Sequence, residues 1–293
     1  MRIVVTGGTG YLGQGITRAL VAAGHEVKVI ARHRGPIPEG ARLVEGDLRT
    51  MDLTDALIGA DAVVHLVGII REQPSQGITF ETVHTNLTFR LLQTMVAASV
   101  RRLIHMSALG TREGAPSRYH QSKWLAESVV HQMQGDGIRP TILRPSFVFG
   151  HGAPFFQMVA QMVRLPLCPL PESGGSVEVQ PVWRDDLARL VVRCLEEEET
   201  VGKVYEVGGP ERMTYRALYQ TVARALRRPE PIFIPVPLDL LQKVAHFGAL
   251  VPQFPVSEDQ VVMLRESNVT EDDRWVAIAG VKPTRLEEVG QDL

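Results

Sequence analysis

The chain has little of what marks secreted, membrane-spanning or nucleic-acid-binding proteins. Its 293 residues include only two cysteines, Cys168 and Cys194, too few for a disulfide framework or a cysteine-based metal site. The formal net charge of −2 gives no general attraction to nucleic acid or to anionic membranes. No apolar run reaches the roughly 18–20 residues of a membrane span, and a strand pattern starts directly after Met1, without room for a signal peptide. We expect a cytoplasmic protein without a metal site, a nucleic-acid partner or a membrane span.

What the chain does have is enough apolar sequence, 44 % of its residues, to bury a full core. Short apolar runs alternate with helix-like stretches over its first half; the runs lie at residues 3–5, 25–31, 41–44, 62–68, 102–107 and 139–143. Such alternation predicts an α/β protein, a Rossmann-type doubly wound parallel sheet with helices on both faces. After about residue 150, prolines interrupt the pattern.

A glycine-rich turn joins the first apolar run to the first helix-like stretch. Residues 6–13 are TGGTGYLG, with Gly7, Gly10 and Gly13 in a G-x-x-G-x-x-G spacing. A strand that ends in such a turn lets the backbone approach a pyrophosphate, and the N-terminus of the following helix faces its negative charge. We therefore expect residues 1–150 to form a dinucleotide-binding domain. Residues 151–293 would add a smaller, interleaved substrate-side lobe that does not fold independently.

The residue after the second apolar run indicates which dinucleotide is bound. NAD-preferring folds usually carry Asp or Glu there, to accept hydrogen bonds from the ribose 2′-hydroxyl. This chain has Arg32, followed by His33 and Arg34. A guanidinium cannot accept those bonds but pairs well with a phosphate, although a solvated basic loop would have the same sequence. The pattern favours NADP(H) over NAD(H).

A tyrosine and a lysine are placed for acid/base chemistry. Tyr119 and Lys123 form a Y-x-x-x-K pattern in a helix-like stretch that follows the apolar run ending at Ser107. Four residues apart on a helix, the two side chains share a face. A nearby ammonium favours the phenolate, so we expect Lys123 to lower the pKa of Tyr119 toward the range of useful proton transfer. The same lysine can hold a nicotinamide ribose.

Together these motifs resemble the short-chain dehydrogenase/reductase superfamily in its extended or atypical form, the NAD-dependent epimerase/dehydratase type. The resemblance covers nearly the whole chain and is carried by TGGTGYLG at 6–13, GDL at 46–48, Asn86, HMSALG at 105–110, Tyr119 with Lys123, LRPSFVFG at 143–150, QPVWRDDLA at 180–188 and YEVGGPERMTYRAL at 205–218. The later pieces, with PVSEDQVVMLRESNV at 255–269, are similar to the NADPH-carrying accessory subunit of mitochondrial respiratory complex I and its bacterial relatives.

The resemblance implies a role for individual residues. Those that would line the pyrophosphate are Gly7, Thr9, Gly10, Tyr11, Leu12 and Gly13. Those that would surround the adenosine are Arg32, at the 2′-phosphate, Asp47, Leu48, Leu66, Val67 and Gly68. Those that would close over the nicotinamide are Pro145, Phe147 and Val148. Tyr119 would be the acid/base, with Lys123 its partner.

One position departs from the family pattern. Related epimerases and reductases end the fifth strand with two or three consecutive Ser/Thr residues, and the last of these hydrogen-bonds the substrate oxygen. This chain has Met106-Ser107-Ala108. Ser107 is a candidate catalytic residue; if the hydroxyl belongs one residue later, that position is Ala108 and Ser107 is structural. Without the hydroxyl, the Tyr/Lys pair would bind NADPH but turn over poorly.

Two classes of function therefore stay open. The first is an NADP-dependent oxidoreductase or epimerase, in which a hydride moves to or from the nicotinamide while Tyr119 moves a proton. The second is a non-catalytic NADP(H)-binding structural or redox-sensing subunit. The Tyr/Lys pair favours the enzyme, and the missing second serine favours the subunit. The small-molecule substrate is not named by the sequence, and both a homodimer and association with a larger assembly stay open.

Three polar residues are interpreted as structural. His65 and His105 lie in apolar runs, where we expect core or edge histidines with satisfied hydrogen bonds rather than ligands. Asn86 is expected to bridge backbone groups of neighbouring elements through its amide.

Overall fold

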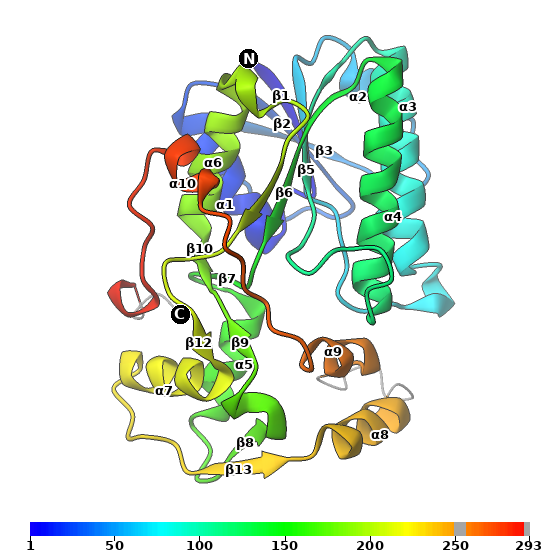
Figure 1. The fold of residues 1–293 in the computed structure, drawn as a ribbon. Coiled ribbons are helices and arrows are strands. Elements are labelled where there is room, and N and C mark those ends of the chain that lie inside the picture. The colour runs from blue at the N-terminus through cyan, green and yellow to red at the C-terminus, as the bar shows by residue number, and fades with distance from the viewer. Residues whose placement is uncertain (249–255, 290–293) are drawn as a thin grey trace.

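Seven parallel strands form the centre of the structure, a computed structural model that describes residues 1–248 and 256–289 (Figure 1). Across the sheet they follow the order β11-β6-β5-β4-β1-β2-β3. Their bounds are β1 Arg2–Thr6, β2 Glu26–Ala31, β3 Ala41–Glu45, β4 Ala62–His65, β5 Arg102–Met106, β6 Arg139–Pro145 and β11 Val204–Val207. The order reverses between β1 and β4, which is the mark of a doubly wound sheet. The predicted Rossmann-type α/β fold is confirmed. Residues 249–255 and 290–293 of the expected lobe lie outside the described residues.

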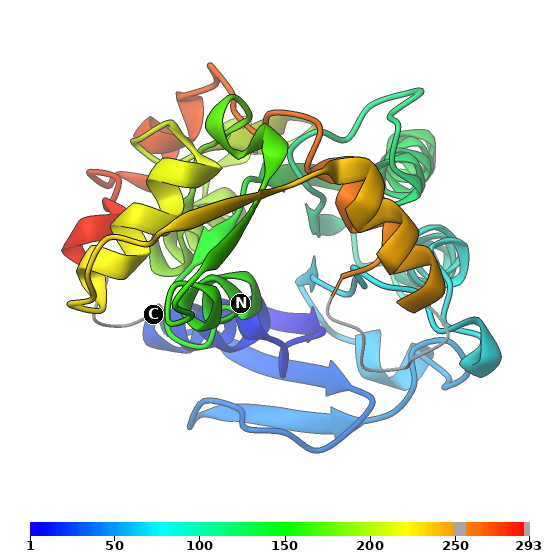
Figure 2. The same ribbon diagram turned by 90° about the horizontal axis from the view of Figure 1, so that it is seen from below.

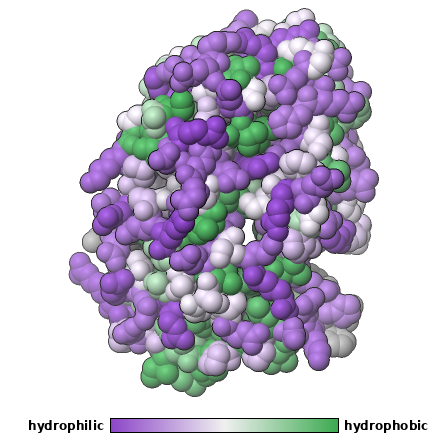
Figure 3. All heavy atoms as spheres, in the orientation of Figure 1, coloured by the Kyte–Doolittle hydropathy of each residue, from purple (hydrophilic) through white to green (hydrophobic). Residues whose placement is uncertain are grey.

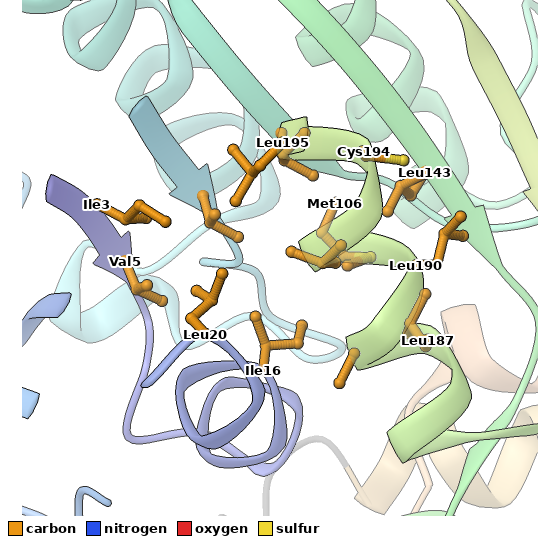
Figure 4. Packing of buried hydrophobic residues seen from close by; sticks show 14 of the residues in the cluster. Ile3, Val5, Ile16, Leu20, Met106, Leu143, Leu187, Leu190, Cys194 and Leu195 are labelled. Atoms are coloured by element: carbon orange, nitrogen blue, oxygen red, sulfur yellow. The ribbon is translucent and has the colours of Figure 1, made fainter. Parts of the chain in front are cut away.

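Helices cover both faces of this sheet. One face carries α1 (Tyr11–Ala22), α6 (Arg184–Glu196) and α10 (Arg274–Ala279); the other carries α2 (Thr54–Leu57), α3 (Leu87–Ala97) and α4 (Arg118–Gln132). Successive residues of a strand point to opposite faces, so Ile104 packs toward α1 and α6 while Leu103 packs toward α3 and α4. Figure 4 shows Leu20 of α1 and Leu190 of α6 in the first of these cores. Helices bury the apolar side chains on both faces of the central strands, as near-continuous apolar strands require.

A smaller lobe lies below the carboxyl edge of the sheet (Figure 1). Its strands pair as β7 (Val148–Phe149) with β10 (Val182–Trp183), β8 (Cys168–Pro171) with β13 (Phe233–Val236), and β9 (Glu178–Val179) with β12 (Met213–Thr214). Its helices are α5 (Pro154–Met162), α7 (Tyr215–Ala225), α8 (Leu238–Gly248) and α9 (Glu258–Met263). Seen from below, α8 and α9 lie on the side of α3 and α4 (Figure 2). Because α6, β11 and α10 return to the sheet, residues 151–293 supply both the lobe and part of the sheet domain.

Short helical turns complete the chain. Those of 3₁₀ type are Pro74–Gln76, Met133–Asp136, Glu172–Gly175, Glu198–Thr200 and Leu286–Glu288, and a π-helical segment, Glu81–Asn86, runs directly into α3. Hydrophilic side chains cover most of the face in Figure 3, and apolar ones gather at its lower edge, over β8 and β13. No helix within residues 1–248 and 256–289 is long and apolar enough to cross a membrane. The same residues contain no group of His, Cys, Asp or Glu side chains that could hold a metal ion.

A buried ion pair fixes α4 on the sheet. Glu127 of α4 is fully buried and accepts two hydrogen bonds from the guanidinium of Arg144 on β6, at 2.9 and 2.6 Å. The guanidinium also meets Glu206 of β11 at 3.5 Å. Loss of one partner from such a pair leaves an uncompensated buried charge. The pair therefore holds α4, and with it Tyr119 and Lys123, in one position.

Candidate functional site

A cavity of about 360 Å³ lies at the carboxyl edge of β1, β2 and β4. The turn after β1, the end of β2, residues 47–49 and the segment after β4 form its walls. These strand ends flank the point at which the strand order reverses, where doubly wound sheets bind dinucleotides. The predicted cofactor residues that line this cavity are Gly7, Thr9, Gly10, Arg32, Asp47, Leu48, Leu66, Val67 and Gly68.

The glycine turn brings the start of α1 to this cavity. Gly7 has a φ of +77°, in the left-handed region that favours glycine, and its N–H donates to the Ile30 carbonyl at 3.1 Å. A Cβ on Gly13 would lie 2.3 Å from the Gly7 carbonyl oxygen, so α1 can approach the turn only without a side chain there. Gly10 precedes α1 and gives it no side-chain cap. Free backbone N–H groups at a helix start are the donor set that suits a pyrophosphate.

Cationic side chains stand at the outer rim, beside the end of β2. Hydrogen bonds from Arg49, chiefly, and the charge of Arg32 lower the pKa of the Asp47 carboxyl. Arg49 donates two hydrogen bonds to the Asp47 carboxylate, from Nε at 3.1 Å and from a terminal nitrogen at 2.7 Å. Arg34 pairs with Glu45 at 3.1 Å. Arg32 is exposed, and in the described part of the chain no carboxylate forms a salt bridge with it.

The remaining predicted cofactor residues lie behind the glycine turn or toward the lobe. They are Tyr11, Leu12, Gly13, Pro145, Phe147 and Val148. The ring of Tyr11 packs under the Arg184 guanidinium, 5.3 Å from the ring centroid, and its buried hydroxyl has no hydrogen-bond partner among the described residues. Phe147 packs against Phe155 at a tilt, with centroids 4.5 Å apart, on the aromatic core of the lobe. The structure thus joins only part of the predicted set into one cavity.

Tyr119 lies in the first turn of α4, among other rings. The centroids of Phe80, His84 and His120 are 5.9, 5.5 and 5.2 Å from that of Tyr119. Burial, together with the carboxylate of Asp259, raises the pKa of Tyr119 to about 12. The prediction that a lysine charge lowers this pKa is therefore wrong for the structure as it stands, because burial and a carboxylate act in the opposite direction.

Lys123 lies one turn further along α4, beneath the cavity wall. Its ammonium is buried and donates to the Met106 carbonyl at 3.0 Å. Burial lowers its pKa to about 8. A Cβ on Gly68 would lie 3.2 Å from Lys123 Nζ, so the glycine lets the ammonium approach the backbone that lines the cavity.

The hydroxyl of Ser107 makes a hydrogen bond within the protein. It is buried and donates to Thr111 Oγ1 at 3.4 Å, while the Ser107 N–H donates to the Leu143 carbonyl at 2.7 Å. The next residue, Ala108, offers only a methyl group. A catalytic role for Ser107 stays a prediction.

His84 is a site residue that the sequence interpretation missed. Its Nε2 accepts a hydrogen bond from the Ile69 N–H at 3.0 Å, so its Nδ1 carries the proton and donates to Ser122 Oγ at 2.8 Å. The Ser122 hydroxyl donates in turn to the Tyr119 carbonyl at 2.7 Å. Burial lowers the pKa of His84 to about 2, and Lys123 adds to this. His84 thus joins the cavity wall to α4 as a neutral ring.

Two structural interpretations are corrected. Asn86 is exposed, and its amide makes no hydrogen bond to another described residue. His65 is satisfied, by Thr6 at 2.7 Å and Thr88 at 3.1 Å. His105, only 2 % exposed, finds no hydrogen-bond partner for either ring nitrogen within residues 1–248 and 256–289, and it lies against His65 with centroids 5.5 Å apart. The expectation of two satisfied core histidines is met by His65 alone.

Comparisons with known proteins agree with this geometry. The mitochondrial NADH dehydrogenase (ubiquinone) 1 alpha subcomplex subunit 9 of Arabidopsis thaliana is 28 % identical over 309 aligned residues, which cover 99 % of this chain and 74 % of that protein. Its counterpart in Mus musculus is 28 % identical over 297 residues, covering 97 % of this chain and 77 % of the other. The predicted similarity to the complex I accessory subunit is confirmed.

A solved structure of UDP-glucuronic acid 4-epimerase from Bacillus cereus, in complex with NAD, superposes with a TM-score of 0.78 at 18 % identity, over 100 % of this chain and 97 % of that one. At that identity the likeness shows the fold. A model of the NAD dependent epimerase/dehydratase family matches residues 3–208, from β1 to just beyond β11. The glycine turn, the cavity and the Tyr/Lys helix all fall within that match, and the chain belongs to the NAD dependent epimerase/dehydratase family.

Proposed function

We propose that this protein binds NADP(H) in the cavity at the carboxyl edge of β1, β2 and β4. The observation that carries the proposal is Arg32, exposed on the rim at the end of β2 without a carboxylate partner in a salt bridge within the described chain. A carboxylate at this position would repel a 2′-phosphate, whereas a guanidinium pairs with it. Arg49 neutralises the nearby carboxylate of Asp47, so the rim keeps a positive charge.

Titration with NADPH and with NADH, followed by nicotinamide fluorescence, tests this assignment. We expect tighter binding of NADPH, and a loss of roughly 10–100-fold in NADPH affinity for Arg32→Asp, because a charge-assisted hydrogen bond contributes about 1.5–3 kcal/mol. Arg18→Asp is the matched control, since Arg18 is exposed on α1 outside the cavity. Equal affinity for both nucleotides, or binding of neither, would overturn the assignment.

We further propose that the protein is an oxidoreductase or epimerase acting at a hydroxyl or carbonyl carbon. When bound, the dinucleotide supplies or accepts a hydride at its nicotinamide ring. Tyr119 would exchange a proton with the substrate oxygen, and Lys123, beside the Gly68 backbone, would hold the nicotinamide ribose. His84 would keep the wall at Ile69 and the first turn of α4 in register.

Tyr119→Phe separates catalysis from binding. The change removes one hydroxyl oxygen and leaves the ring among Phe80 and His84. We expect turnover in a screen of carbonyl and alcohol substrates to fall by about 10²–10⁴-fold, the usual contribution of a general acid/base, with NADPH affinity unchanged. A Tyr119→Phe protein with full turnover would contradict the acid/base role.

A second candidate function is a non-catalytic NADP(H)-binding subunit, and one feature of the site favours it. If the catalytic hydroxyl of related enzymes belongs one residue after Ser107, that position is Ala108 and has none, and the Ser107 hydroxyl itself donates to Thr111. The mitochondrial relatives are named as subunits of NADH dehydrogenase, which suits membership of a larger assembly. This candidate predicts tight NADPH binding and the same behaviour for wild type and Tyr119→Phe.

A further inference from the structure

The C-terminal part of the described chain reaches back to the start of α4. Asp259, in the first turn of α9, accepts hydrogen bonds from two backbone N–H groups of α4, that of Arg118 at 2.7 Å and that of Tyr119 at 2.9 Å. A helix start leaves four such donors without intrahelical partners. Ser117, which precedes α4, caps a third donor, that of His120, at 3.1 Å. A carboxylate 140 residues further along the chain therefore completes the cap of the helix that carries Tyr119.

The segment after α9 is anchored, so Asp259 has a fixed position. Asn268 donates through Nδ2 to the Leu109 carbonyl at 3.0 Å and accepts through Oδ1 from Ser146 Oγ at 2.6 Å. Its backbone N–H donates to the Glu178 carbonyl at 2.8 Å. Leu109 follows β5 and Ser146 follows β6, so Asn268 ties this segment to the carboxyl ends of two strands and to the lobe.

The bases around Tyr119 do not offset the charge of Asp259. His84 and His120 contact the Tyr119 ring, and burial lowers the pKa of each, so both are neutral at pH 7 and above. The cations on the same helix are Lys123, whose ammonium donates to the Met106 carbonyl, and Arg118, which pairs with Glu72.

An ion pair at this end of α4, between Glu72 and Arg118, carries no net charge. Glu72, on the segment after β4, pairs with the Arg118 side chain at 2.8 Å and also accepts from the Phe80 N–H at 2.8 Å. Asp259 has its two hydrogen bonds to α4 from uncharged backbone groups. Its negative charge therefore acts on the phenol of Tyr119.

We propose that Asp259 is a positioning residue for Tyr119: its carboxylate fixes the first turn of α4 and places a negative charge beside the phenol. The proposal rests on the acid/base role proposed above for Tyr119. A negative charge beside the phenol disfavours the phenolate, and the neutral phenol is the form that donates a hydrogen bond to a carbonyl oxygen. The lobe, through α9, thus adds to the effect of burial on the proton affinity of a residue in the sheet domain.

Asp259→Asn tests this by removing the charge while keeping an oxygen that can accept one N–H. We expect the pKa of Tyr119 to fall by about one unit, which is a roughly tenfold higher phenolate fraction at a given pH. Ultraviolet phenolate absorbance measures it, and subtraction of the same titration for Tyr119→Phe in each background isolates Tyr119 from the other tyrosines. An unchanged titration of Tyr119 in folded Asp259→Asn would overturn the proposal.

Glu271→Gln is the matched control, because Glu271 lies further along the same segment and its exposed carboxylate pairs with Arg212. It removes an equal charge away from the cap of α4, and we expect no shift in the Tyr119 titration. Asp259→Ser is a second neutral variant with an oxygen acceptor; both neutral variants should show the same lowered pKa, with circular dichroism reporting the fold. The titration needs neither nucleotide nor substrate. Failure to bind NADPH would therefore contradict the proposed function and leave this result standing.

Discussion

Gly13→Ala is expected to lower the free energy of unfolding by about 3 kcal/mol, the upper end of the usual cost of overpacking, and to abolish NADPH binding. A Cβ on Gly13 would lie 2.3 Å from the Gly7 carbonyl oxygen and 2.5 Å from Gly8 Cα. Both atoms belong to the backbone of the turn, which the hydrogen bond from Gly7 to Ile30 holds against β2. No side chain can rotate to relieve the overlap, so either α1 or the turn must move.

Urea unfolding followed by circular dichroism gives the change in stability, and NADPH fluorescence gives the change in binding. Gly135→Ala is the control, because a Cβ on Gly135 would meet no atom within 4 Å; we expect it to stay within about 0.5 kcal/mol of wild type. An unfolding midpoint and NADPH affinity for Gly13→Ala equal to those of Gly135→Ala would show that the turn is more compliant than its backbone contacts indicate.

The features that were predicted correctly are local in sequence. The strand–turn–helix pattern at residues 2–22 needs only neighbouring residues, and it placed Gly7 and Gly10 in the wall of the cavity. The parallel sheet was predicted from runs of consecutive apolar residues, which are typical of strands covered by helices on both faces. This pattern, too, depends only on neighbouring residues. Arg32 was placed at the cavity rim because the residue after β2 always faces the carboxyl edge of this fold.

The features that were missed depend on contacts between distant segments. The pKa of Tyr119 rises first because the fold buries the phenol, and second because α9 brings Asp259 from 140 residues away; no local pattern indicates either cause. His84 was overlooked because it lies in the stretch between the apolar runs at 62–68 and 102–107, where only a helix was expected. In the structure a π-helical segment, Glu81–Asn86, carries the buried His84 and the exposed Asn86. Such segments often occur at functional sites, so a histidine in place of an apolar residue on the inner face was the available signal.

Three of the four buried histidines in the described chain, those at most 2 % exposed, are expected to make the protein lose stability steeply between pH 7 and pH 5. His65, His84 and His105 are 1 %, 1 % and 2 % exposed. Burial lowers the pKa of His65 to about 3 and that of His84 to about 2, and it holds the pKa of His105 well below its ordinary value. In the unfolded chain all three would titrate near 6.5.

The direction of this change in stability follows from proton uptake by the unfolded chain. As the pH falls through 6.5, the unfolded chain binds protons that the folded chain excludes, so the free energy of unfolding decreases. At pH 5 each histidine costs about 2 kcal/mol, and the three together cost about 6 kcal/mol, comparable to the whole stability of many domains. Lys123, with a pKa lowered to about 8, is charged in both states over this range. The ordinary carboxyl pKa lies below pH 5, and the pKa values of Asp47 and Asp272 are lowered further. Both groups therefore stay ionised between pH 7 and pH 5.

His105→Leu tests this coupling most directly, because neither ring nitrogen of His105 has a hydrogen-bond partner to lose. The variant should be at least as stable as wild type at pH 7.5 and should lose about 2 kcal/mol less between pH 7.5 and pH 5, roughly a third of the acid effect. Urea unfolding at the two pH values measures both quantities. His151→Gln, which changes an exposed histidine, should retain the full wild-type loss. A His105→Leu protein that still loses as much stability as wild type would mean that His105 takes up a proton in the folded state, so that the cluster with His65 relaxes rather than excluding charge.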